Sequence, residues 1–336
     1  MKTIVYPPTI DYNWLFQRPQ QLLNQLSKKG FNIIFYNNDA YLPQKTPVVQ
    51  ISDNMLLCKK GVKLDSVLEE KDFYLYITYP PHVVYTENKG NMRVIFDAID
   101  DASHEFSYWK PYISGIRQKA DVVLASSQKI YEEHYKYHPE VFLCPNGADF
   151  DHFSKSQQIF SKRPKDLPKN ERLTIGYIGA IASWMDWKLL HYIVYKNRDI
   201  NFVFIGPMYN KVRNLVQGEN VYYLGRKDYK ELPYYLQYFD ACIIPFKINS
   251  MTQGCNPIKV YEYLSAGKPV IATNMRELKG IAGVYLADSA KKFHYYIQKS
   301  LYQDQLNNKL LRINIAKENS WESRANQVKG ILTKRK

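Results

Sequence analysis

Residues 256–273 read NPIKVYEYLSAGKPVIAT, a stretch that joins a short helix to a buried strand. We expect the helix to begin after Pro257 and to end at Gly267, since glycine is a common helix stop. The following PVIAT, residues 269–273, is short and apolar, as is typical of a strand. The stretch therefore predicts one helix–strand unit of an α/β fold.

The same alternation of short apolar runs and amphipathic stretches continues on both sides of this unit. Continuous apolar runs suit parallel strands that are buried on both faces. The polar segment 154–172 interrupts the pattern and is interpreted as a linker. The sequence therefore predicts two doubly wound, Rossmann-like domains facing a cleft, with ligands at the carboxyl ends of the strands. The expected strands are 3–8, 31–38, 73–80, 93–100 and 121–127 before the linker, and 173–180, 201–207, 220–225, 241–246 and 268–273 after it.

The composition is that of a folded protein with an uneven distribution of charge. The 336 residues are 45% hydrophobic and 23% charged, which excludes disordered, collagenous and fibrous chains. Residues 161–336 hold 29 Lys and Arg against 14 Asp and Glu, whereas residues 1–160 hold 17 against 18. Either the second half has a solvated, lysine-rich surface, or it binds an anion such as a nucleotide, a nucleic acid or a lipid headgroup.

The sequence shows no feature of a secreted or membrane-spanning protein. The opening MKTIVYPP has no secretory apolar segment, and no apolar run approaches the ~20 residues of a membrane span. The four cysteines lack CxxC spacing, which favours reduced thiols in a cytoplasm over zinc or disulfides. The 29 tyrosines have no RRM, OB, KH or helix-turn-helix signature beside them, so we expect no nucleic-acid partner.

The helix start at Pro257 and Ile258 is a candidate phosphate site, because the first turn of a helix offers free backbone N–H groups and a positive dipole end. Lys259 lies in this first turn, where a cation opposes the helix dipole, and a bound anion would compensate for it. Glu262 follows three residues later and shares a helix face with Lys259. The alternative is an ordinary Lys–Glu pair on a helix surface.

Two other places in the second half could contact the same ligand. Gly179 belongs to a glycine-containing loop after a strand, where the backbone could approach a phosphate closely, although tight packing explains such glycines equally well. Arg226 and Lys227 come directly after another strand and could contact a base or phosphates. Their alternative is a solvated turn.

In the first half, carboxylates gather at the carboxyl end of the expected strand 93–100. Asp97 follows the apolar run of this strand, Asp100 and Asp101 come next, and His104 lies just beyond. A carboxylate or histidine there could deprotonate a hydroxyl group if partial burial brought its pKa towards neutrality. Asp101 and His104 are the candidate catalytic residues, and helix capping is the alternative.

The loop before the first long helix is a candidate binding site for a sugar. It combines Asp11, Asn13 and Arg18 with the aromatic residues Trp14 and Phe16. Aromatic rings beside hydrogen-bonding groups suit sugars, which are apolar on one face and hydroxylated at the edge. We expect Trp14 and Phe16 to be core residues, so Asp11, Asn13 and Arg18 are the candidate acceptor contacts.

Taken together, several stretches resemble the GT-B-fold glycosyltransferases, in particular the family 4-like enzymes that build bacterial polysaccharides. The resemblance extends along most of the chain and rests on the order of its motifs. These motifs are WLFQRPQQLL (14–23), PNGADFDHF (145–153), IGYIGAIASWMDWKLL (175–190), YYLGRKDYKELPYYLQYFDACIIPF (222–246) and NPIKVYEYLSAGKPVIAT (256–273).

The resemblance implies an activity and a separate binding role for each domain. Residues 1–153 would bind the acceptor, and residues 173–336 would bind the nucleotide-sugar, with the last helix packing back on the first domain. Glu262 would hold the ribose, while Lys259 and nearby amides would hold the diphosphate. The expected protein is a hexosyltransferase-like enzyme that moves a sugar from a UDP-sugar, its donor substrate, to a glycan or lipid-linked acceptor of a cell-envelope or exopolysaccharide pathway.

The sequence also departs from the family pattern. Many family 4 members have a glutamate at the position of Gly254, so the donor sugar and the retaining or inverting outcome stay open. This departure motivates an alternative: a non-catalytic, sugar-nucleotide-binding scaffold of a polysaccharide assembly complex. The Asp149–Asp151 segment spells DFD, but it belongs to the motif 145–153, and we expect no metal and no other cofactor. The charge distribution predicts at most weak, salt-reversible association with the inner face of the cell membrane.

Overall fold

A computed structural model of the chain describes residues 2–68, 72–87, 90–158, 163–209, 212 and 214–334. The chain forms two compact units, each with its own sheet. The segment 154–172, expected as a linker, is part of the second unit, and its residues 159–162 lie outside the described residues. The first unit comprises Met1–Asn146, Gly254–Asn256 and Trp321–Lys336, and the second comprises Gly147–Gln253 and Pro257–Ser320.

The first unit is built on an eight-stranded sheet in the order β3-β4-β2-β1-β5-β6-β7-β8. Neighbouring strands are parallel except for the antiparallel pair β3–β4. The sheet runs through β1 (Lys2–Tyr6), β2 (Phe31–Tyr36), β3 (Val48–Ser52), β4 (Met55–Cys58), β5 (Phe73–Ile77), β6 (Arg93–Ala98), β7 (Val122–Ala125) and β8 (Val141–Leu143).

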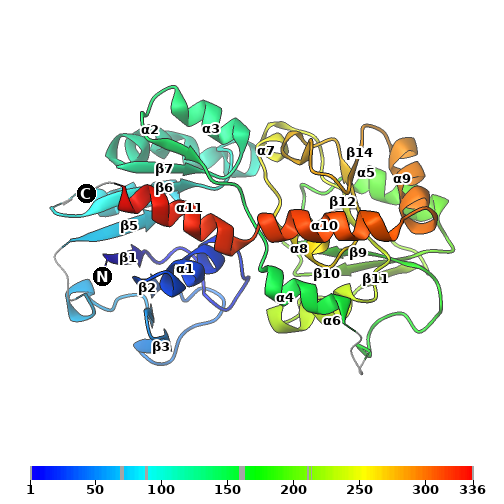
Figure 1. Cartoon of the computed structure of the whole chain (residues 1–336), viewed down its shortest axis with the longest axis horizontal. Coiled ribbons are helices and arrows are strands. Elements are labelled where there is room, and N and C mark those ends of the chain that lie inside the picture. Colours follow the sequence, from blue (N-terminus) through cyan, green and yellow to red (C-terminus); the bar gives the residue numbers. More distant parts are fainter. Residues whose placement is uncertain are drawn as a thin grey trace. The chain divides into compact units, whose positions relative to one another are not determined.

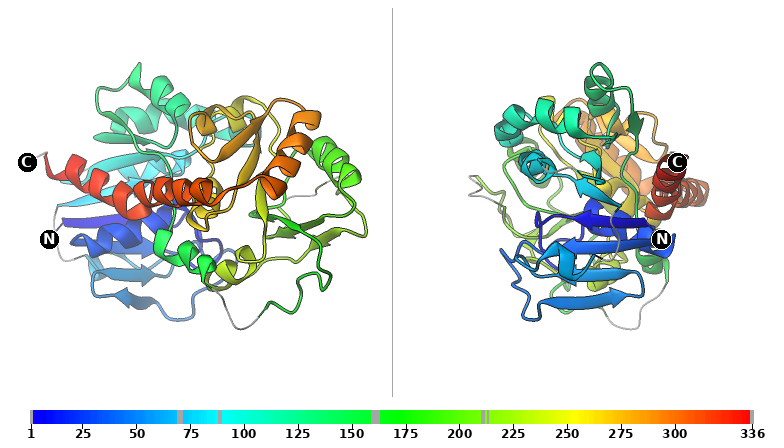
Figure 2. Two further views of the ribbon diagram at one scale, coloured as in Figure 1. Left: turned by 45° about the vertical axis from the view of Figure 1, so that its right-hand side comes forward. Right: turned by 90° about the vertical axis from the view of Figure 1, so that its left-hand side faces the viewer.

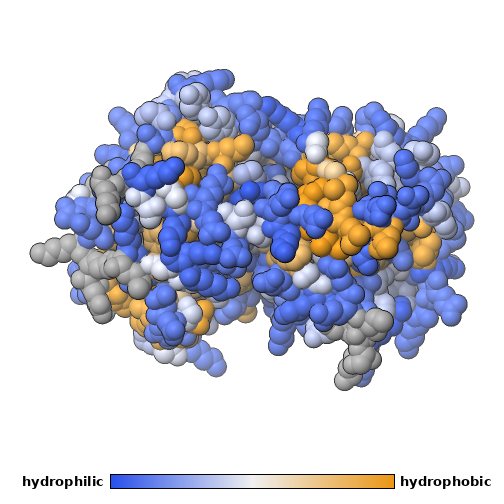
Figure 3. Space-filling model, in the orientation of Figure 1, coloured by the Kyte–Doolittle hydropathy of each residue, from blue (hydrophilic) through white to orange (hydrophobic). Residues whose placement is uncertain are grey.

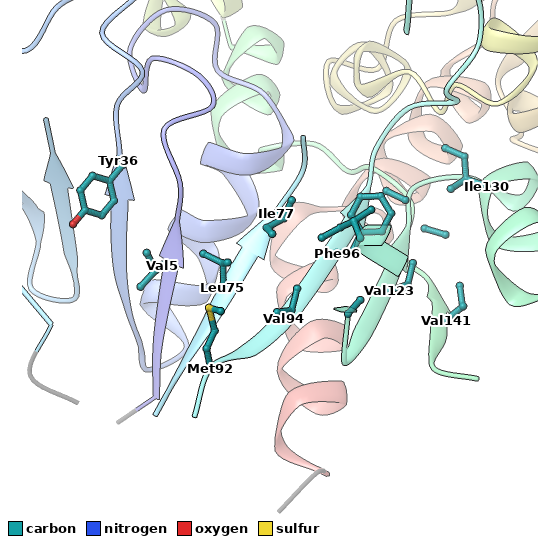
Figure 4. Close-up of a cluster of buried hydrophobic side chains, with 14 of the residues drawn as sticks. Val5, Tyr36, Leu75, Ile77, Met92, Val94, Phe96, Val123, Ile130 and Val141 are labelled. Carbon is teal, nitrogen blue, oxygen red and sulfur yellow. The ribbon is translucent and has the colours of Figure 1, made fainter. Parts of the chain in front are cut away.

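Helices cover both faces of this sheet. On one face, α1 (Arg18–Lys28) and α11 (Trp321–Thr333) lie side by side, although nearly the whole sequence separates them (Figure 1 and Figure 2). On the other face, α2 (Lys110–Lys119) and α3 (Gln128–Tyr135) pack against alternate residues of adjacent strands. Figure 4 shows this second core, in which Val5, Leu75, Val94 and Val123 come from four neighbouring strands.

The sequence of α1 explains its place. Pro19, in the first turn of the helix, supplies the fixed backbone angle that a helix start favours. Leu22, Leu23 and Leu26 follow at helical spacing and are fully buried.

The second unit is built on six parallel strands in the order β11-β10-β9-β12-β13-β14. The strand order reverses between β9 and β12, and in open α/β sheets ligands bind at the carboxyl ends beside such a reversal. The strands are β9 (Thr174–Ile178), β10 (Asn201–Ile205), β11 (Val221–Tyr223), β12 (Ala241–Ile244), β13 (Val270–Thr273) and β14 (Val284–Ala287). The helices are α4 (Phe150–Ser154), α5 (Trp187–Lys196), α6 (Leu232–Leu236), α7 (Ser250–Gln253), α8 (Ile258–Ser265), α9 (Ala290–Tyr302) and α10 (Leu306–Glu318).

The expected α/β fold with two Rossmann-like parallel sheets is confirmed. The stretch 256–273 forms a helix, α8, that leads to β13, as its sequence predicts. The expected strands omitted β3, β4, β8 and β14, which are short and lie at or near the edges of their sheets. Throughout the described ranges, each helix is too short or too polar to cross a membrane.

Candidate functional site

Glycines follow three adjacent strands at the carboxyl edge of the second sheet. Gly179 comes directly after β9 and Gly206 directly after β10, with φ values of 151° and 148°, and Gly225 follows β11 with φ 68°. The Gly179 N–H donates to the Ile205 carbonyl at 2.8 Å, and the Gly206 N–H donates to the Gly225 carbonyl at 2.9 Å. A Cβ at Gly206 would lie 1.9 Å from the Gly179 carbonyl oxygen. Backbone rather than side chains therefore lines this edge.

Lys259 reaches this glycine-lined edge from the first turn of α8. A Cβ at Gly179 would lie 2.7 Å from Lys259 Cε and 3.1 Å from its Nζ, so the side chain occupies the space that the glycine leaves. The Nζ atom also lies 5.5 Å from the ring centroid of Tyr177 and 5.2 Å from that of Phe246. Such rings attract a cation through their π faces. The ammonium group is thus positioned over the loop at the carboxyl ends of β9 and β12.

The chemistry of this arrangement suits a phosphate or diphosphate. Pro257 is the N-cap of α8 and offers no side-chain cap, while the Val260 N–H donates to the Pro257 carbonyl at 3.2 Å. Ile258 begins the helix beside Lys259. Helix N–H groups, a positive dipole end and an ammonium group together form an electrostatic environment that stabilises a multiply charged anion.

Glu262 lies one turn after Lys259 on the same helix. It is half-buried, and burial raises the pKa of its carboxyl group to about 7, with Lys259 lowering and Asp149 raising the value. The neighbouring Asp149 accepts the backbone N–H of His152 at 3.2 Å and so caps α4. Lys259 and Glu262 therefore differ from a solvated surface pair, since both are half-buried. A carboxyl group in this state can accept hydrogen bonds from a pair of hydroxyl groups, as a ribose offers.

A tyrosine of α8 fixes the helix against β9. The Ile178 N–H donates to the Tyr263 hydroxyl at 2.8 Å, and this hydroxyl group donates to the Ile178 carbonyl at 3.3 Å. Sequence reasoning missed Tyr263, the rings of Tyr177 and Phe246, and the close approach at Gly206. Of these, Gly206 had a usable signal, because the expected strand 201–207 ends in a Gly-Pro pair.

Arg226 and Lys227 lie beside acidic neighbours. Lys227 Nζ is 2.5 Å from Asp166, whose other oxygen accepts the Tyr235 hydroxyl at 2.9 Å. Arg226 lies 3.8 Å from Asp228, and both side chains are partly exposed. The structure therefore ties Lys227 to the segment before β9, while Arg226 is the more accessible of the two.

Arg18 is a buried structural residue in the first unit. Its Nε and NH2 groups donate to the two carboxylate oxygens of Asp97 at 2.7 and 2.8 Å. Its NH1 group donates to Asn146 Oδ1 at 3.0 Å and to the Pro145 carbonyl at 3.2 Å. Only 2% of Arg18 is exposed. The side chain thus joins α1 to the end of β6 and to residues 145–146, and these partners occupy its donors.

Asp11 also has a structural set of partners. Its carboxylate accepts backbone N–H groups from Ala40, Tyr41 and Leu42 at 3.2, 2.5 and 2.8 Å. Burial alone would raise the pKa of Asp11, but these hydrogen bonds lower it. Asp11 therefore fixes the loop 40–42. Asn13, the third expected acceptor contact, is exposed.

The loop held by Asp11 presents an aromatic pair. Trp14 stacks on Tyr41, with ring centroids 4.7 Å apart and planes inclined by 8°. Trp14 is half-buried and 60% of Tyr41 is exposed, so the expected core position of Trp14 is wrong. An exposed aromatic pair of this kind can contact the apolar face of a sugar.

The carboxylates after β6 differ in their surroundings. Asp101 is buried and forms an ion pair with Lys129 of α3. Burial, together with the charge of Asp101, raises the pKa of Asp100 to about 6. His104 is exposed, with φ 47°. A Cβ at Gly254 would lie 3.1 Å from Asp101 Cβ, which shows why this position has little room for a larger residue.

Among the residues that the structure describes, no group of three or more His, Cys, Asp or Glu is arranged to hold a metal ion. Asp149, part of the DFD segment, acts as the cap of α4.

Comparison with known proteins supports the resemblance drawn from the motifs. Residues 172–302 match the model of the family described as "Glycosyl transferases group 1". Over 227 residues, 63% of this chain, the sequence is 28% identical to the "Putative teichuronic acid biosynthesis glycosyltransferase TuaH" of Bacillus subtilis (strain 168). This match spans 57% of the length of that protein.

Several solved structures have the same fold over almost the whole chain. Sucrose-phosphate synthase from Thermosynechococcus elongatus is 13% identical, with a TM-score of 0.73 and 99% of each chain covered. HepE from Anabaena, in complex with UDP and glucose, is 11% identical, with a TM-score of 0.72 and the same coverage. Trehalose 6-phosphate synthase from Burkholderia multivorans is 10% identical, with a TM-score of 0.74, and 99% of this chain and 98% of that chain are covered. The expected resemblance is thus confirmed: the chain has the GT-B fold of these glycosyltransferases, and residues 172–302 match the group 1 family.

Proposed function

We propose that the protein is a glycosyltransferase that moves a sugar from a UDP-sugar to a glycan or lipid-linked acceptor in cell-envelope or exopolysaccharide biosynthesis. The family match over residues 172–302 supports the reaction class. The name of TuaH supports an envelope polysaccharide, and the UDP and glucose bound to HepE support the donor. The observation that carries the proposal is the position of Lys259 over the Gly179 loop at the carboxyl edge of the second sheet.

In this proposal the second unit binds the donor. The diphosphate contacts Lys259, the first N–H groups of α8 at Ile258 and the backbone at Gly179, while Glu262 accepts the ribose hydroxyl groups. The departing UDP carries additional negative charge when the glycosidic bond breaks. A fixed ammonium group and a helix N-terminus stabilise this charge without a metal ion.

The first unit would bind the acceptor, and the Trp14–Tyr41 pair is the surface that suits a sugar ring best. A retaining reaction needs no protein base, because the departing phosphate accepts the acceptor's proton. An inverting reaction needs one. Asp101, the expected base, is paired with Lys129, whereas burial raises the pKa of Asp100 to about 6, so we propose Asp100 as the base of an inverting reaction.

A thermal-shift screen tests the donor assignment. A ligand that binds the folded state raises the unfolding midpoint in proportion to ln(1 + [L]/Kd). We expect UDP and UDP-sugars to shift the midpoint more than other nucleoside diphosphates, and uridine to shift it least. A screen in which no nucleotide shifts the midpoint would contradict the assignment.

An assay for hydrolysis of the UDP-sugar distinguishes an enzyme from a non-catalytic scaffold. A glycosyltransferase is expected to hydrolyse its UDP-sugar slowly in the absence of acceptor, which is measured as release of UDP. Gly254, where many family members have a glutamate, motivates the scaffold alternative. UDP binding without hydrolysis or transfer, on any UDP-sugar and acceptor tried, would favour the scaffold.

A further inference from the structure

Helix α10 exposes three leucines while it buries an arginine. Leu306, Leu310 and Leu311 are 70%, 52% and 46% exposed, whereas Arg312 of the same helix is 1% exposed. Surface helices normally bury their leucines and expose their charged residues. We call the three outward residues the α10 leucine face. Figure 3 shows an apolar patch on the surface where α10 lies in Figure 1.

The contacts of Arg312 explain why the leucines point outwards. Its Nε donates to the Gly267 carbonyl at 2.8 Å, and its NH1 donates to Asp304 at 2.9 Å. A Cβ at Gly283 would lie 2.3 Å from Arg312 Cγ, so this glycine makes room for the side chain. Turning α10 to bury its leucines would pull the buried Arg312 away from Asp304 and the Gly267 carbonyl, which is costly. The exposure of the leucine face is therefore fixed by the fold.

The surroundings of the leucine face are positively charged and aromatic. Tyr295 and Tyr302 of α9 are 56% and 60% exposed. Residues 290–317 contain one acidic residue, Asp304, which pairs with Arg312. The same segment contains five lysines, Lys291, Lys292, Lys299, Lys309 and Lys317, of which Lys292 pairs with Asp288 just before the segment.

We propose that the α10 leucine face docks on an anionic lipid bilayer. Leucine and tyrosine side chains would enter the boundary between headgroups and acyl chains, and the lysines would contact the anionic headgroups. A second copy of the chain is a poorer occupant, because a two-fold interface would bring identical lysine-rich surfaces together. The proposal goes beyond sugar transfer and does not rest on it.

The leucine face changes the expectation drawn from charge alone. Lysine contacts with anionic lipids are screened by salt, so charge alone predicts association that salt reverses. Burial of leucine side chains in the bilayer does not depend on charge, so salt does not weaken it. We therefore expect part of the binding to persist at high salt.

Co-sedimentation of the full chain with vesicles of phosphatidylglycerol and phosphatidylcholine tests the proposal. The triple variant L306S/L310S/L311S is expected to lose the salt-resistant binding and to bind at least about tenfold more weakly than wild type. The control I51S/V84S, which changes two exposed aliphatic residues of the first unit, is expected to bind as wild type does. The variant K291Q/K292Q/K299Q is expected to lose low-salt binding and to keep the salt-resistant part.

Circular dichroism melting confirms that each variant is folded, and sedimentation velocity gives its oligomeric state. Wild-type protein that does not bind these vesicles, or a leucine variant that binds them unchanged, would overturn the proposal. A wild-type dimer that L306S/L310S/L311S converts to a monomer would also overturn it, since a second copy would then cover the leucine face.

Discussion

The carboxyl ends of the two sheets carry charge in different surroundings. In the first unit, Arg18 and Asp97 form a bidentate pair in a fully packed interior. In the second unit, Lys259 lies over two aromatic rings and against Gly179, at an edge lined by glycine backbone. A charge enclosed by its partner stabilises the fold, whereas a half-buried charge at a backbone-lined edge can meet a ligand. A charged side chain at the carboxyl edge of a sheet thus indicates binding only when its burial is incomplete.

The largest expected effect is on the enclosed pair. Arg18→Ala leaves Asp97 buried without its counter-ion, which costs about 3–5 kcal/mol of unfolding free energy. Urea unfolding measures this loss. The control Lys29→Ala breaks the partly exposed pair with Glu322 and should cost at most ~1 kcal/mol. An Arg18→Ala variant as stable as this control would contradict the structural role of the Arg18–Asp97 pair.

The second prediction concerns the space beside Lys259. Gly179→Ala places a Cβ 2.7 Å from Lys259 Cε at φ 151°, so we expect a loss of about 1–3 kcal/mol in stability. We also expect weaker UDP binding, because the lysine must move. The control Gly330→Ala has open space and a helical position and should be neutral or slightly stabilising. Normal UDP affinity in folded Gly179→Ala would contradict the close approach of ligand and backbone.

The third prediction follows from the carboxyl group of Glu262. Its pKa is raised from 4.5 to about 7 by burial, with Lys259 acting in the opposite direction. The folded state keeps this proton to higher pH than the unfolded chain, so the contribution to stability is present below about pH 4.5 and is lost as pH rises to about 7. The unfolding free energy of wild type minus that of Glu262→Gln should therefore fall as the pH rises from about 4.5 to about 7. A flat difference would show that Glu262 is exposed.

The smallest expected effect is none. With Lys259 and the α8 N-terminus to neutralise the diphosphate, transfer activity should survive treatment with EDTA. Activity abolished by EDTA and restored by Mn²⁺ or Mg²⁺ would instead assign a metal-binding role to the carboxylates of the chain.

Local signals in the sequence predicted the parts of the fold and site that depend on neighbours along the chain. Pro257 and Gly267 bounded the helix α8, and the apolar run after them predicted β13. The short edge strands β3 and β8 gave no such signal, because five and three residues with partial exposure show little periodicity.

Contacts between distant segments could not be predicted in the same way. The polar residues Asp11 and Arg18 resembled ligand contacts in sequence, but backbone N–H groups and Asp97 occupy them in the structure. Tyr263 acquires its role only because α8 lies against the end of β9. Sequence reasoning identifies residues with suitable chemistry, and burial then decides whether that chemistry serves the fold or a ligand.

Titration calorimetry of Lys259→Ala against UDP and uridine tests whether Lys259 binds the diphosphate. A charge-assisted contact with the diphosphate is worth roughly 1.5–3 kcal/mol, so we expect about 10- to 150-fold weaker UDP binding. Uridine, which has no phosphate, should bind nearly as it does to wild type. Lys196→Ala, an exposed lysine of α5, is the matched control and should change neither affinity. Unchanged UDP affinity in Lys259→Ala, or an equal loss for uridine, would contradict the proposed donor site.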